Sequence, residues 1–276
     1  MFDSKKFSFR SLCLLFLCLF LYSIQVYSKT IVVSDIDDTI KKSNSAGKGA
    51  EQIYHFLRKV PYLEMRDFFN EIRENEKGRG ETVKFYYVSA AKSFTFNAQK
   101  WLQKNHFPLG RSTLKSMSEK RSTFDFKYAV IKQIILDEMN SLDIEGNEPL
   151  EFLMFGDNAQ VDADVYSKLS KELQLNSKIY IRDVRTVATY FDPSLPLERL
   201  EGVNYYFSEV ELFRNAEFDY LSADLINRTY NTYLDRELVP EYTLKTLGRR
   251  LEAVYGDKDQ AKAAARQYWD DYYSRL

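Results

Sequence analysis

The feature that most constrains this chain is an apolar, β-branched run that ends abruptly in acids. Residues 31–40 read Ile-Val-Val-Ser-Asp-Ile-Asp-Asp-Thr-Ile. Such a run predicts a buried strand, and loops at the carboxyl ends of parallel strands are where α/β proteins place their chemistry. Strand alternation sends the side chains of Asp35 and Asp37 to the same side. Carboxylates this close repel one another unless a cation lies among them, and oxygen ligands favour a hard ion such as Mg²⁺.

A second acidic cluster lies far along the chain. The apolar run at 151–155 breaks at Gly156 and is followed by Asp157, Asp162 and Asp164. Two strands that both end in carboxylates can complete one metal site if they lie side by side. The alternative is that these acids only end strands and cap turns, as short polar residues often do. The presence of two such clusters favours a catalytic site.

Five motifs, in order along the chain, carry a resemblance to a known family. They are Ser-Asp-Ile-Asp-Asp-Thr-Ile-Lys (34–41), Tyr-Val-Ser-Ala (87–90), Phe-Lys (126–127), Phe-Gly-Asp-Asn-Ala-Gln-Val-Asp (155–162) and Ile-Tyr-Ile-Arg-Asp-Val (179–184). On these motifs the chain resembles the haloacid dehalogenase superfamily of phosphohydrolases. Within that superfamily it is most similar to the catalytic domain of the actin-patch-associated, lipin-related phosphatidate phosphatases.

The resemblance implies a role for each motif residue. Asp35 would be the nucleophile that forms an aspartyl-phosphate. Asp37 would protonate the leaving alcohol and then activate water, which requires a carboxyl whose neighbours have raised its proton affinity. The residues implied to bind the substrate phosphate are Thr39, Ser89, Ala90 and Lys127, of which Ser89 and Lys127 also count as catalytic. The implied Mg²⁺ ligands are Asp35, the backbone carbonyl of Asp37, Asp157 and Asp162.

Alternatives stay open at several of these positions. Lys127 is preferred as the phosphate-neutralising cation because it matches the family's Phe-Lys position, and Lys132 is interpreted as a solvated helical residue. Either Asp162 or Asp164 is the outer acid of the metal site. Asp38 stands where many superfamily members carry Gly, and either adds charge beside the metal or hydrogen-bonds the following loop. The loop at 156–160 reads Gly-Asp-Asn-Ala-Gln, whereas the lipid phosphatases that the chain resembles typically carry Gly-Asp-Ser-Gly-Gln. This difference leaves the identity of the substrate open.

The N-terminus has the pattern of an export signal. Basic residues within positions 5–10 precede an apolar stretch at 12–22, and residues 26–28 resemble a cleavage site. We therefore expect a signal peptide over residues 1–28 and a periplasmic or secreted protein, with an uncleaved N-terminal anchor as the alternative. Both cysteines, Cys13 and Cys18, lie in that stretch, so the remaining chain has no thiol nucleophile, disulfide or zinc-thiolate site.

Strands alternate with helices, which predicts an α/β fold with a doubly wound, Rossmann-like parallel sheet. The expected strands are 31–35, 83–88, 151–155 and 179–182, and the expected helices are 50–59, 62–75, 94–104, 126–139 and 162–173. Residues 29–190 form the predicted catalytic domain. Only about 50 residues separate Thr39 from Ser89, so a cap between them is small or absent, and an open site suits a lipid or macromolecular ester.

Residues 191–276 are rich in aromatic residues and are predicted to be a helical extension packed on the same domain. The preferred interpretation is that the rings pack the helices onto the domain, since aromatic residues dominate ordinary cores. The alternative is an aromatic platform at a membrane interface. A formal net charge of -1 argues against a general nucleic-acid surface.

Two classes of function remain. The preferred one is an exported, Mg²⁺-dependent phosphomonoesterase acting on phosphatidate or another lipid phosphate, in peripheral contact with a membrane; soluble phosphoesters are alternative substrates. The other is a non-catalytic phosphate- or lipid-binding module. Intact Asp35 and Asp37 favour the enzyme, because function depends on the site rather than on the fold.

Overall fold

The computed structural model describes seven stretches of the chain: residues 29–43, 59–93, 96–145, 149–184, 199–206, 209–213 and 215–234. The predicted signal peptide, residues 44–58 between Thr39 and Ser89, which include most of the helix expected at 50–59, and the tail beyond residue 234 lie outside these stretches. Within them, no helix combines the length and the apolar character needed to cross a membrane.

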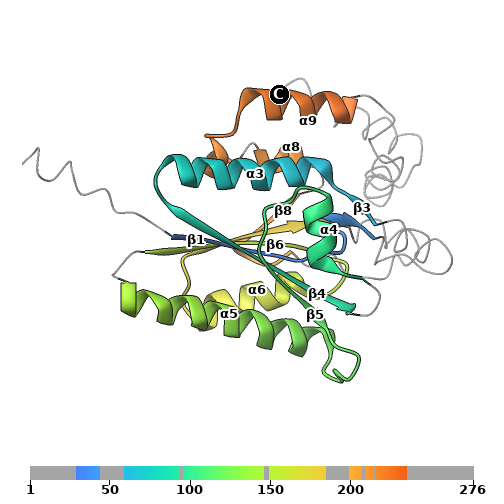
Figure 1. Cartoon of the computed structure of the whole chain (residues 1–276), viewed down its shortest axis with the longest axis vertical. Coiled ribbons are helices and arrows are strands. Elements are labelled where there is room, and N and C mark those ends of the chain that lie inside the picture. Colours follow the sequence, from blue (N-terminus) through green and yellow to red (C-terminus); the bar gives the residue numbers. More distant parts are fainter. Residues whose placement is uncertain are drawn as a thin grey trace, which may run out of the picture.

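The described core is a six-stranded sheet in the order β5-β4-β1-β6-β7-β8, and every neighbouring pair is parallel. Its strands are β1 (Lys29–Ser34), β4 (Thr82–Lys92), β5 (Arg111–Lys115), β6 (Leu150–Asp157), β7 (Ser177–Arg182) and β8 (Val203–Tyr206). The predicted α/β fold with a parallel sheet is confirmed. β1 lies between β4 and β6, so the segments that leave these three strands meet at one edge of the sheet (Figure 1).

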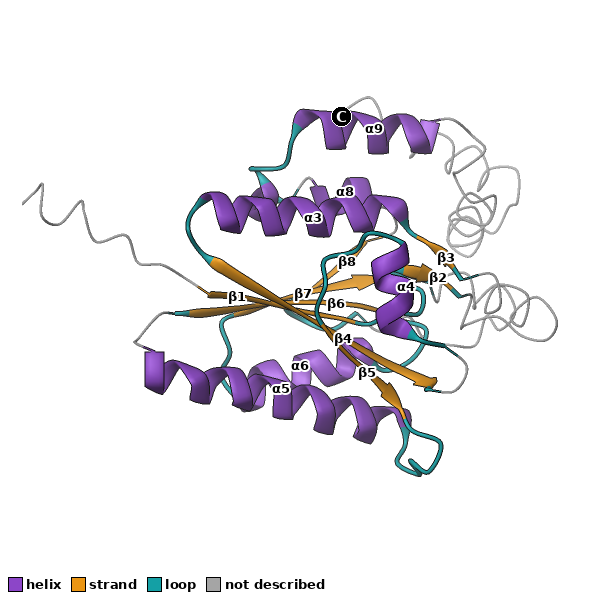
Figure 2. Ribbon diagram, viewed as in Figure 1, coloured by secondary structure: helices purple, strands orange, loops and turns teal. Residues whose placement is uncertain are grey.

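Helices cover both faces of the sheet, as Figure 2 shows. They are α3 (Leu63–Gly78), α4 (Ala98–Lys104), α5 (Thr123–Glu145), α6 (Asp162–Glu172), α8 (Glu209–Phe213) and α9 (Ala223–Leu234), with a 3₁₀ helix at Ala216–Phe218. α5 and α6 lie on one face, and α3 and α8 lie on the other, with α9 outside them. This layering explains the apolar run at the centre of β1, because Val32 faces one core while Ile31 and Val33 face the other.

The core on the α3 side is built from aromatic rings. The ring of Phe68 lies 5.8 Å from Phe155, 5.3 Å from Phe213 and 4.8 Å from Phe218, measured between centroids. Phe213 and Phe218 belong to the C-terminal extension, and both are buried. These two rings therefore pack onto the domain, as the preferred interpretation of the aromatic residues predicts.

The sequence patterns missed four strands. Two of them, β5 and β8, are edge strands, and their residues, Arg-Ser-Thr-Leu-Lys and Val-Asn-Tyr-Tyr, lack the apolar run of a central strand. The other two, β2 (Lys41–Lys42) and β3 (Val60–Pro61), form a short antiparallel pair beside the β1 exit. The helix expected from residue 94 begins at Ala98, because the Asn97 side chain accepts a hydrogen bond from the backbone N–H of Lys100 at 2.9 Å.

Candidate active site

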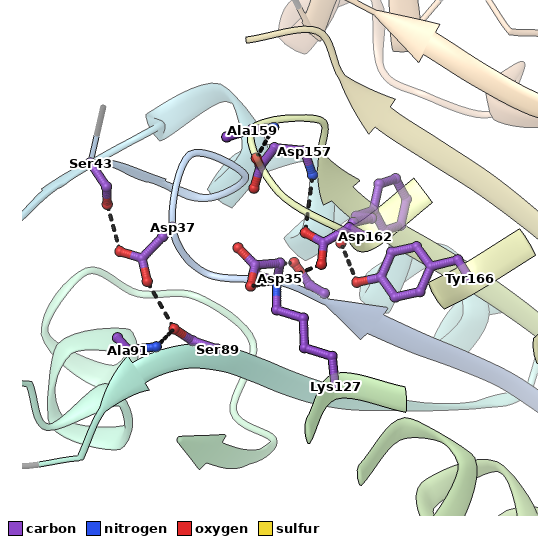
Figure 3. Close-up of polar contacts among 12 residues, drawn as sticks. Asp35, Asp37, Ser43, Ser89, Ala91, Lys127, Asp157, Ala159, Asp162 and Tyr166 are labelled. Carbon is purple, nitrogen blue, oxygen red and sulfur yellow. Dashed lines mark hydrogen bonds and ion pairs between the residues drawn. The ribbon is translucent and has the colours of Figure 1, made fainter. Parts of the chain in front are cut away.

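Three acids, from the ends of two neighbouring strands and the start of α6, lie together at the exit of β1. The backbone N–H of Asp35 donates to the Phe155 carbonyl at 2.8 Å, which ties the β1 exit to β6. Asp35, Asp157 and Asp162 are all buried, and one carboxylate oxygen from each lies within 4.8 Å of the others. Figure 3 shows these side chains converging. The two acid-terminated strands lie side by side, which is the condition that the sequence analysis set for a single metal site.

A glycine makes this convergence possible. Asp162 begins α6 and turns back so that its Oδ2 accepts from the Asp157 backbone N–H at 3.3 Å. A Cβ on Gly156 would lie 2.6 Å from the Cβ of Asp162 and 2.9 Å from Cε2 of Tyr166. Only glycine leaves room for this approach. Asp164 is exposed, so Asp162 is the acid that the fold brings to the cluster.

The cluster contains one buried cation. Lys127, on the first turns of α5, places its Nζ 2.6 Å from Oδ1 of Asp35 and 2.5 Å from Oδ1 of Asp162. Lys132 lies elsewhere, with its Nζ 2.6 Å from Oε1 of Glu172 on a partly exposed surface. Of the two candidate lysines, the structure brings only Lys127 to the acids.

The electrostatics of the cluster leave it short of positive charge. Burial raises the pKa of Asp35 well above its ordinary value; the ammonium of Lys127 opposes this, and the Asp162 carboxylate adds to it. Burial and the neighbouring Asp162 and Asp35 carboxylates likewise raise the pKa of Asp157. For Lys127, burial favours the neutral amine, but Asp162 and Asp35 outweigh it and raise the pKa. One ammonium cannot balance three carboxylates in a buried site.

A divalent cation fits this deficit. Every donor in the cluster is a carboxylate oxygen, which suits a hard ion such as Mg²⁺. Oδ2 of Asp35 is buried and has no hydrogen-bond partner among the described residues. Buried polar atoms are seldom left unsatisfied, so this oxygen is one that a ligand would satisfy.

Asp37 lies beside the cluster but its carboxylate points elsewhere (Figure 3). Its Oδ2 accepts from the Ser89 hydroxyl at 2.8 Å, and its Oδ1 accepts from the Ser43 hydroxyl at 2.6 Å and from Lys41. Burial opposes the charge on Asp37, but the Lys41 ammonium and these hydrogen bonds outweigh it and lower the pKa. The expectation that its neighbours raise its proton affinity is therefore wrong, because Lys41 is a partner that the sequence analysis does not include.

The predicted phosphate-binding residues border the same space. Thr39 is fully buried, and its hydroxyl has no hydrogen-bond partner among the described residues. Ser89 and Ala90 lie where the pairing of β4 with β5 is interrupted by a bulge between Ser89 and Lys92. The Ser89 oxygen also accepts from the Ala91 backbone N–H at 3.0 Å. Bulges of this kind re-aim side chains at active sites.

The structure explains the unusual Asp38. Its φ of 59° is in the left-handed region, where glycine is unstrained and other residues seldom lie. Its Oδ1 accepts from the Ser43 backbone N–H at 2.8 Å. The hydrogen bond to the following loop is therefore present, and the Asp38 carboxylate also helps to raise the pKa of Asp157, so its charge acts on the acid cluster as well.

Sequence reasoning gave no role to three residues around the site, Lys41, Ser43 and Arg182. Lys41 and Ser43 hold the carboxylate of Asp37, and Arg182 lies at the end of β7 with its guanidinium 3.4 Å from the Thr39 carbonyl. Lys41 and Arg182 fall within the motifs at 34–41 and 179–184, and a charged residue close behind an apolar run is the signal that could have marked them. Their partners are set only by the fold.

Comparison with known proteins agrees with this arrangement. The family model described as "Phosphatidate phosphatase APP1, catalytic domain" matches residues 30–183, which is more than half of the chain. The matched range runs from β1 to the residue after β7 and contains every site residue predicted from sequence. No curated protein matches the chain significantly.

Proposed function

The chain belongs to the family of phosphatidate phosphatase catalytic domains and is a phosphatase, and on this premise we propose that it is a Mg²⁺-dependent phosphomonoesterase that acts through an aspartyl-phosphate. The observation that carries the proposal is the state of Asp35. Lys127 holds Oδ1 of this carboxylate at 2.6 Å, while Oδ2 is buried without a hydrogen-bond partner among the described residues. A carboxylate held in this way presents one oxygen for nucleophilic attack.

The metal would be held by the carboxylates of Asp35, Asp157 and Asp162, with the backbone carbonyl of Asp37 as a further ligand. Bound there, Mg²⁺ would supply positive charge to the phosphoryl oxygens and to the crowded carboxylates. Lys127 would share this task, since its ammonium already contacts two of the three acids.

The residues of the chain account for both displacements. An oxygen of Asp35 attacks phosphorus as the bond to the leaving alkoxide breaks, and the alkoxide takes a proton from Asp37. Asp37 then removes a proton from water, which attacks the aspartyl-phosphate and regenerates the Asp35 carboxylate and inorganic phosphate. The hydroxyl of Ser89, 2.8 Å from Asp37, would turn to a phosphate oxygen when substrate binds. Asp37 would thereby lose a hydrogen bond that lowers its pKa, so its proton affinity would rise with substrate in place.

The substrate that the family suggests is phosphatidate or another lipid phosphate, reached by peripheral contact with a membrane. The basic and apolar pattern of residues 5–28 supports export to the periplasm or beyond. Soluble phosphoesters are the second candidate substrates. A non-catalytic phosphate-binding module is the competing function, and it predicts binding without phosphate release.

The test is phosphate release by residues 29–276, with and without Mg²⁺, across phosphatidate, lysophosphatidate, nucleotides, sugar phosphates and phosphoproteins. Asp35→Asn should abolish release. It should leave the free energy of unfolding unchanged or raised at neutral pH, because burial makes the Asp35 charge costly. The matched control is Asp164→Asn, which changes an exposed acid two residues beyond Asp162 and should leave release intact. Phosphate release by the Asp35→Asn variant would exclude Asp35 as the nucleophile. Absence of release by the unaltered protein would favour the non-catalytic binding module.

A further inference from the structure

We propose that Glu209, which lies beyond the matched phosphatase domain, is a positioning residue for the turn at residues 36–41, which follows Asp35, and acts through Arg182. This inference rests on the proposed function. The family match ends at residue 183, whereas Glu209 begins α8 in the C-terminal extension. The extension is thus part of the catalytic apparatus and not only a cover for the core.

Arg182 joins the two acid-bearing loops. It is the register partner of Asp157 across the β6–β7 pair, and its backbone carbonyl accepts from the Asn158 N–H at 3.1 Å. Its side chain reaches the other loop, where Nη2 lies 3.4 Å from the carbonyl oxygen of Thr39. One residue therefore contacts the segment after the nucleophile and the segment after the second metal-site acid.

The guanidinium of Arg182 is buried, and Glu209 neutralises it. Nη2 of Arg182 pairs with Oε1 of Glu209, and the side chains are 3% and 0% exposed. The guanidinium also lies 4.0 Å from the ring centroid of Tyr62 and 5.0 Å from that of Tyr206. A buried cation is stable only when it is paired, so the pose of Arg182 against Thr39 depends on the Glu209 carboxylate.

The loop that Arg182 contacts is itself tightly folded. The backbone N–H groups of Ile40 and Lys41 both donate to the carbonyl of Ile36, at 3.1 and 2.9 Å. This turn carries Asp35 and Asp37 at one end and Thr39 at its centre. If Arg182 shifts, the Thr39 carbonyl loses its contact and the turn loosens. The reacting groups on this turn would then move, and a displacement of about 1 Å is enough to slow catalysis.

The test is Glu209→Gln in the full mature chain, with Glu201→Gln, an exposed glutamate of the same extension, as the matched control. We expect kcat on a soluble phosphate monoester to fall about 10- to 100-fold while KM changes little. Backbone amides of residues 36–41 should exchange hydrogen faster than in the unaltered protein. Normal kcat and normal exchange in folded Glu209→Gln would overturn the proposal.

A double variant separates positioning from stability. Arg182→Met with Glu209→Met replaces the buried ion pair by apolar side chains and should fold at least as stably as the unaltered protein. It has no guanidinium for the Thr39 carbonyl, so kcat should remain as low as in Glu209→Gln. Recovery of full kcat in the double variant would show that the pair only stabilises the fold. Absence of turnover in the unaltered protein would instead contradict the proposed function, and the exchange of residues 36–41 would then decide the inference alone.

Discussion

Gly156→Ala tests directly whether close approach of Asp162 builds the acid cluster. The backbone of Gly156 lies outside the left-handed region, so alanine can adopt it. Its new methyl group, however, would lie 2.6 Å from Cβ and 2.9 Å from Oδ2 of Asp162. Carbon atoms pack best at about 3.5 Å or more, so Asp162 must retreat by roughly 1 Å.

We expect two measurable losses from that retreat. Overpacking a buried site costs about 1–3 kcal/mol of unfolding free energy. A displacement of about 1 Å in a residue that supports the reacting groups lowers kcat about 100-fold. Urea-induced unfolding gives the first quantity, and steady-state phosphate release from a soluble monoester at saturating Mg²⁺ gives the second.

Gly78→Ala is the matched control, because a Cβ at Gly78 meets nothing within 4 Å. Gly78 ends α3, where alanine is the better helix former, so this variant should be neutral or up to about 1 kcal/mol more stable. If Gly156→Ala kept full kcat and unfolded within about 0.5 kcal/mol of the unaltered protein, the steric argument for the cluster would fail.

Three further predictions concern Lys127, Glu138 and Asp38. Lys127→Met leaves buried carboxylates unpaired, so it should abolish turnover and cost about 3–5 kcal/mol in urea unfolding at neutral pH, with partial recovery on acidification as Asp35 takes up a proton. Glu138, on α5, accepts a hydrogen bond from Tyr86 and pairs with Lys29 and Lys84. Burial opposes the charge of Glu138, but these hydrogen bonds outweigh it and lower the pKa. The stability that the charged Glu138 contributes is therefore complete above its ordinary pKa of 4.5 and is lost as the pH falls through the lower folded value. Glu138→Gln should flatten that acid limb of the stability curve, and an unchanged slope would contradict this assignment. Asp38→Ala and Asp38→Gly both lose the hydrogen bond to the next loop, but only the alanine variant keeps the strain of the positive φ. Asp38→Ala should therefore have a free energy of unfolding about 1 kcal/mol lower than Asp38→Gly. Equal stabilities of the two variants would exclude the strain.

Much of the fold could be read from local pattern. Central strands such as β1 and β6 are buried on both faces, so each contains a continuous apolar run that stands out in the sequence. The edge strands β5 and β8 carry no such run, because half-exposed strands tolerate polar residues, and they were missed. Asp35 and Asp157 could be found because Asp35 follows β1 directly and Asp157 ends β6.

The sequence by itself therefore determined the sheet's central strands, their acidic exits and the class of chemistry, since these depend on residues that are neighbours along the chain. Only the tertiary structure decided which side chains meet. Lys127 reaches Asp35 across 92 positions, and Glu209 reaches Arg182 across 27. Lys41 is close to Asp37 in sequence, yet the turn between them decided that it lowers the pKa of Asp37. Proton affinity depends on burial and on partners in space, and neither is a property of local sequence.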